Sequence, residues 1–101
     1  MSDYYDKQGQ SLTLFEWAAL VARHDPAYKR VLETTLTNGR WVSTVWVGLN
    51  HQFGTGPPLI FETMVFPKEG DFSELDMARY GTIQEAQTGH DVMVQKWSNE
   101  P

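Results

Sequence analysis

Three side chains in this sequence have the chemistry of acid–base catalysis, provided that the fold brings them together. His90 could act as a general base, with Glu62 or Tyr80 as its hydrogen-bonding partner. His90 also lies in the apolar stripe of a helix predicted over residues 83–97, where a histidine is more often a core residue. Burial there would lower its pKa below the usual value near 6.5. We favour this core interpretation and keep the His90, Glu62 and Tyr80 pocket as a second hypothesis.

Glu62 is the one charged residue within an apolar run at residues 59–66. A charged group that faces a core must be paired or neutralised. Basic residues on neighbouring predicted strands could pair with it: Lys29, Arg40 and Arg79. We therefore favour a structural ion pair over a catalytic role for Glu62.

An acidic segment follows that run and could bind a cation or dock on a basic partner. Its four carboxylates fall within eight residues: Glu69, Asp71, Glu74 and Asp76. Their spacing does not match an EF-hand loop, which needs ligands at positions 1, 3, 5 and 12 and a glycine at 6. A solvated acidic turn is the simpler interpretation.

Phosphate and metal motifs are weak in this sequence. Gly54-Thr55-Gly56 resembles part of a phosphate loop, but it lies between two predicted antiparallel strands and does not open a helix. The three histidines show no HxH or HxxxH spacing, and there is no cysteine. The sequence therefore predicts neither a metal site nor a cofactor.

Two capping boxes mark the helices that would position these residues. Thr13 and Glu16 begin a helix that ends before Pro26, and Thr82 and Glu85 begin the helix that carries His90. The predicted strands cover residues 4–5, 28–37, 41–49, 59–66 and 74–80. Asn38-Gly39 predicts a two-residue type I′ hairpin between the second and third of these strands.

The strand predicted over residues 41–49 is apolar on both faces. Trp41, Val45 and Val47 alternate with Val42 and Trp46, and the strand over residues 59–66 repeats the pattern. The predicted fold is α+β, a four-stranded antiparallel meander with two helices on one face, in the order β-α-β-β-β-β-α. Because those helices cover one face, we expect a protein partner or a homodimer to cover the other. The candidate contact residues are Trp41, Trp46, Asn50, His51 and Phe53.

Composition sets limits on the class of protein. With 101 residues and 41% hydrophobic residues, the chain is expected to form one domain over 1–101, with 98–101 as a frayed tail. The N-terminus lacks the pattern of a signal peptide, and no apolar run is long enough for a membrane span. The net charge of −5 argues against binding to nucleic acid. We expect a cytoplasmic protein that binds neither membrane nor nucleic acid.

The chain resembles a family of small bacteriophage and prophage proteins of unknown function. The resemblance is carried by YYDKQG at 4–9, ETTL at 33–36, RWVSTVW at 40–46, GPPLIFETMVF at 56–66, and by Arg79-Tyr80, Thr82, Glu85-Ala86, Gly89-His90 and Trp97. It spans most of the chain and implies a phage or prophage origin and a site of action in the host cytoplasm. It implies no particular activity.

Three functions follow from these observations. We favour a non-enzymatic protein that acts by binding other proteins, such as an inhibitor of a host enzyme or defence system, because no catalytic constellation stands out. A small enzyme or ligand-binding module built on the His90, Glu62 and Tyr80 pocket is the second hypothesis. A minor structural component of a virion is the third.

Overall fold

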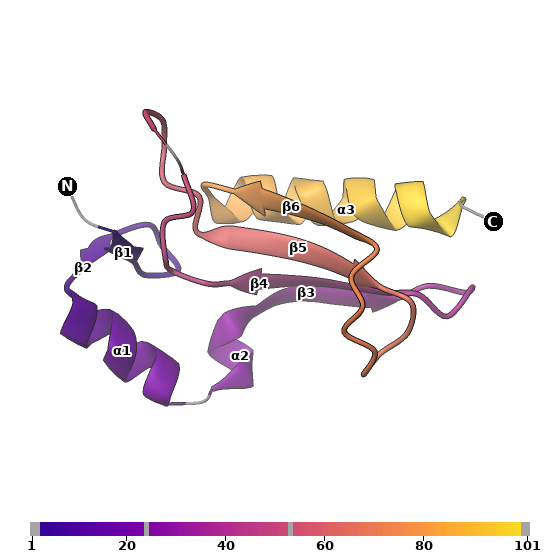
Figure 1. Ribbon diagram of the computed structural model, residues 1–101, viewed down its shortest axis with the longest axis horizontal. Coiled ribbons are helices and arrows are strands. Elements are labelled where there is room, and N and C mark those ends of the chain that lie inside the picture. Colours follow the sequence, from indigo (N-terminus) through magenta and orange to yellow (C-terminus); the bar gives the residue numbers. More distant parts are fainter. Residues whose placement is uncertain (1–2, 24, 53, 100–101) are drawn as a thin grey trace.

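A computed structural model describes residues 3–23, 25–52 and 54–99 of the chain (Figure 1). Its elements are β1 (Tyr4–Tyr5), β2 (Ser11–Leu12), α1 (Leu14–Ala22), α2 (Pro26–Lys29), β3 (Arg30–Thr35), β4 (Trp41–Trp46), β5 (Phe61–Phe66), β6 (Asp76–Tyr80) and α3 (Ile83–Ser98). The expected frayed tail is thus helical at Ser98, with Asn99 as the C-cap, and its last two residues lie outside the described part.

The central feature is a four-stranded sheet in the order β3-β4-β5-β6, with every neighbouring pair antiparallel. This confirms the predicted α+β class and the four-stranded meander. The register sets Trp41 opposite Phe66 at one end of the sheet and Val45 opposite Glu62 near the other. On β6, Arg79 lies opposite Glu62, so Val45, Glu62 and Arg79 are neighbours on three adjacent strands.

Two short elements were not expected from the sequence. Strand β2 pairs with β1 to form a separate two-stranded sheet. Helix α2 occupies the start of the strand expected from residue 28, because the Asp25 side chain accepts a hydrogen bond from the Ala27 N–H and Pro26 stands at the start of the turn. Strand β3 therefore begins only at Arg30.

The hairpin between β3 and β4 differs from the predicted two-residue type I′ turn. The Leu36 N–H donates to the Arg40 carbonyl at 2.7 Å, and the Gly39 N–H donates to the Leu36 carbonyl at 2.9 Å. These bonds enclose a three-residue loop that ends in Gly39 at φ 91°. The structure thus has a three-residue hairpin loop with its last residue, a glycine, in the left-handed region. An Asn-Gly pair fits this type of loop as well as the two-residue turn.

Helix α3 packs across all four strands and covers one face of the sheet (Figure 1). Side chains alternate between faces along a strand, and on β4 the buried ones are Val42, Thr44 and Trp46. Met93 of α3 joins Val42 in one core cluster, while Ala86 joins Trp46 in a second. Helix α1 packs its Trp17 against the Trp46 cluster at the end of the sheet.

Gly89 lets α3 approach the edge strand β6 closely. A Cβ at this position would lie 2.1 Å from the Cε1 atom of Tyr80, far inside van der Waals contact. The Tyr80 ring therefore occupies the space that a larger residue at position 89 would need.

We expect Gly89→Ala to destabilise the protein, although alanine normally favours a helix over glycine by about 0.5–1 kcal/mol. The displaced Tyr80 ring should make the net effect a loss of about 1–3 kcal/mol in the free energy of unfolding. Urea denaturation of this variant beside Gln87→Ala, at an exposed position of the same helix, measures it. A Gly89→Ala variant more stable than the wild type would contradict the close approach.

Candidate functional site

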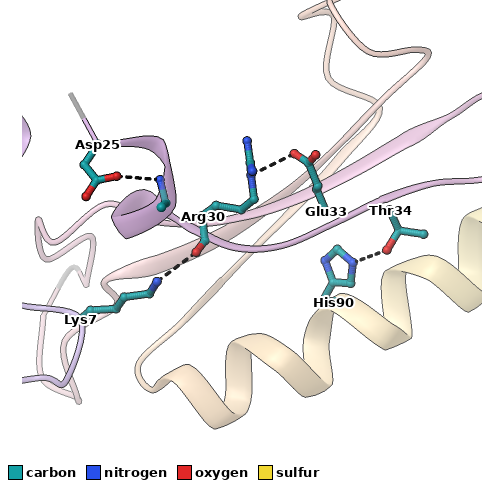
Figure 2. A network of polar contacts seen from close by, with 7 residues as sticks. Lys7, Asp25, Arg30, Glu33, Thr34 and His90 are labelled. Atoms are coloured by element: carbon teal, nitrogen blue, oxygen red, sulfur yellow. Dashed lines mark hydrogen bonds and ion pairs between the residues drawn. The ribbon is translucent and has the colours of Figure 1, made fainter.

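His90 lies in the core between α3 and the sheet, within a network of threonine hydroxyls. Its Nε2 atom is 2.8 Å from the Thr34 hydroxyl (Figure 2). Its Nδ1 atom is 2.8 Å from the Thr44 hydroxyl. The Thr44 hydroxyl is also hydrogen-bonded to the hydroxyl of Thr63 on β5. Because a hydroxyl can donate or accept, both ring nitrogens are satisfied in either neutral tautomer.

This environment favours the neutral imidazole. His90 is 2% exposed, and its burial lowers the pKa of the ring, although nearby Asp91 raises it in part. The expected core histidine with a lowered pKa is therefore what the structure contains.

The predicted catalytic trio is not assembled. Glu62 alternates with buried Phe61 and Thr63 on β5, so its side chain lies on the face of the sheet away from α3 and His90. There its carboxylate is 3.6 Å from Nε of Arg79, which is the structural ion pair that the sequence suggested. Tyr80 packs its ring against Gly89, but the nitrogens of His90 are bonded to threonines. The three side chains therefore do not converge, and His90 is enclosed in the core.

The opposite face of the sheet is the better candidate for a functional site. It carries half-buried apolar side chains, and among the described helices only α3, on the other side, contacts β5 and β6, so no helix covers what these two strands present here. Antiparallel sheets that face water on one side normally carry polar residues there. The central apolar residues of this open face are Trp41 and Val45 on β4, Met64 on β5 and Met77 on β6.

Three aromatic rings form one end of the open face. Trp41 stacks on Phe66 with ring centroids 5.4 Å apart, and Phe72 meets Phe66 edge-on at 5.7 Å. Phe72 belongs to the loop between β5 and β6 and is 76% exposed. Our sequence reasoning missed Phe72, although a large apolar residue between Asp71 and Glu74 is an unusual member of a solvated turn.

The predicted acidic segment divides between the two faces. The Asp71 carboxylate accepts a hydrogen bond from the Ser73 backbone N–H, which lowers the pKa of Asp71 and closes the turn. Asp76 instead points to α3, where its Oδ2 atom accepts from Nζ of Lys96 at 2.7 Å and from Nε1 of Trp97 at 2.9 Å. The Lys96 and Trp97 bonds lower the pKa of Asp76 and attach the end of α3 to β6.

The other predicted contact residues have structural roles or lie outside the description. Trp46 is 1% exposed and donates from Nε1 to the Tyr5 carbonyl, so the prediction that it contacts a partner is wrong. The Asn50 side chain accepts from the backbone N–H groups of Gln52 and Leu59 and so closes the base of its loop. The His51 N–H donates to the Leu59 carbonyl. Phe53 lies outside the described residues.

Other kinds of site find little support in this structure. In residues 3–23, 25–52 and 54–99, no three His, Asp or Glu side chains gather in a way that could hold a metal ion. None of the helices in those ranges is long and apolar enough to cross a membrane. A groove of about 470 Å³ lies between the β1–β2 turn, Pro57-Pro58 and the start of α3, but neither His90 nor Glu62 lines it.

Comparison with known proteins gives no further guide. No protein-family model, curated protein or solved structure matches the chain.

We expect the stability of the protein to fall as the pH drops below about 6.5. The folded state binds the proton on His90 less readily than the unfolded chain, because burial lowers its folded pKa. The stability that the neutral His90 ring contributes is therefore fully present above the pKa of the unfolded chain, and it declines as the pH falls below that value. An NMR titration should place the pKa of His90 below 6.5, and urea denaturation at pH 7.5 and 5.5 should show the decline. A pKa of His90 above 6.5 would mean that a carboxylate pairs with it.

We expect Thr44→Val to destabilise the fold by about 1–3 kcal/mol, although valine has nearly the same shape. The change leaves Nδ1 of His90 and the Thr63 hydroxyl buried without their shared partner. Thr35→Val, at an exposed position of β3, is the matched control. If urea denaturation gives the two variants equal stability, the buried network contributes nothing measurable.

Proposed function

We propose that this protein functions by binding another polypeptide through the open face of its four-stranded sheet. The observation that carries the proposal is a group of half-buried apolar side chains on that face. Met64 lies opposite Met77, Trp41 and Val45 lie on the neighbouring strand on either side of Ser43, and among the described residues no helix extends over Met64 and Met77. Larger apolar surfaces left open on a soluble domain commonly mark protein interaction sites.

The chemistry of the face also supports protein binding. Tryptophan and methionine are enriched in protein interfaces, and their large side chains provide contact area. The charged groups beside the apolar centre are paired: Arg79 with Glu62 at 3.6 Å and Arg30 with Glu33 at 3.2 Å. A partner can therefore cover the apolar centre without burying an unpaired charge.

The resemblance to small phage and prophage proteins, which implies no particular activity, is compatible with a binding role. A host enzyme or defence complex is one possible occupant of the face, and a second copy of the chain is another. The enzyme hypothesis receives less support, because His90 is buried and both of its nitrogens have partners.

Photo-crosslinking tests this proposal. A photoreactive amino acid at position 45 should give crosslinked products in cells that express the protein, whereas the same group at Gln87, on the exposed side of α3, should give few. Adding Met64→Lys to the first variant should abolish its products, since the charge disrupts the apolar centre. The mass of the product separates a second copy of the chain from a different protein. Equal products from both positions, or none from position 45, would contradict the proposal.

A further inference from the structure

We draw no further inference here: the strongest candidate, the apolar surface patch on the outer side of helix α1, where Leu14 and Phe15 are exposed, carries none because nothing in the structure shows what covers it.

Discussion

The packing of one helix, α3, on one face of the sheet is the interaction on which the rest of this structure depends. It buries apolar clusters around Val42 and Trp46, and it places His90 among threonine hydroxyls of β3 and β4. The apolar clusters provide most of the driving force, because hydrophobic burial is the largest favourable term in folding. The polar network adds specificity, since its buried hydroxyls have partners only in this alignment of helix and strands.

A single helix can cover only one face of a sheet, and this constraint produces the open face. Helix α1 packs at the end of the sheet against the Trp46 cluster, and α2 packs beside the start of β3 (Figure 1). Among the described elements, neither extends over Met64 and Met77 in the middle of the other face. The same strands that stabilise the core through one face thus present apolar side chains on the other.

Much of this arrangement was predictable because local patterns determine it. The capping boxes located the starts of α1 and α3, and the alternation along residues 41–46 assigned the side chains of β4 to two faces, which the structure shows as one buried row and one half-buried row. The sequence could not show which row α3 would cover, because both rows are apolar. That choice depends on contacts between distant segments, such as His90 with Thr44.

Predictions failed where tertiary contacts outweighed local composition. Asp76 belongs by sequence to an acidic turn, yet the strand register turns it to α3, where Lys96 and Trp97 bind it. Phe72 belongs by sequence to the same polar turn, but its ring folds back from the loop between β5 and β6 and contacts the ring of Phe66. The catalytic trio failed because Glu62 and His90 lie on opposite faces, a separation that becomes visible only when α3 is assigned to a face.

Methionine methyl NMR tests the open face most directly, because the chain carries its own internal control. Met64 and Met77 lie on the open face, whereas Met93 belongs to α3 and is 7% exposed in the core on the other face. On dilution of the full chain, or on addition of a crosslinked partner once it is identified, the methyl signals of Met64 and Met77 should shift while that of Met93 stays unchanged. Shifts confined to Met93, or no shift in any of the three when a complex forms, would contradict binding through this face.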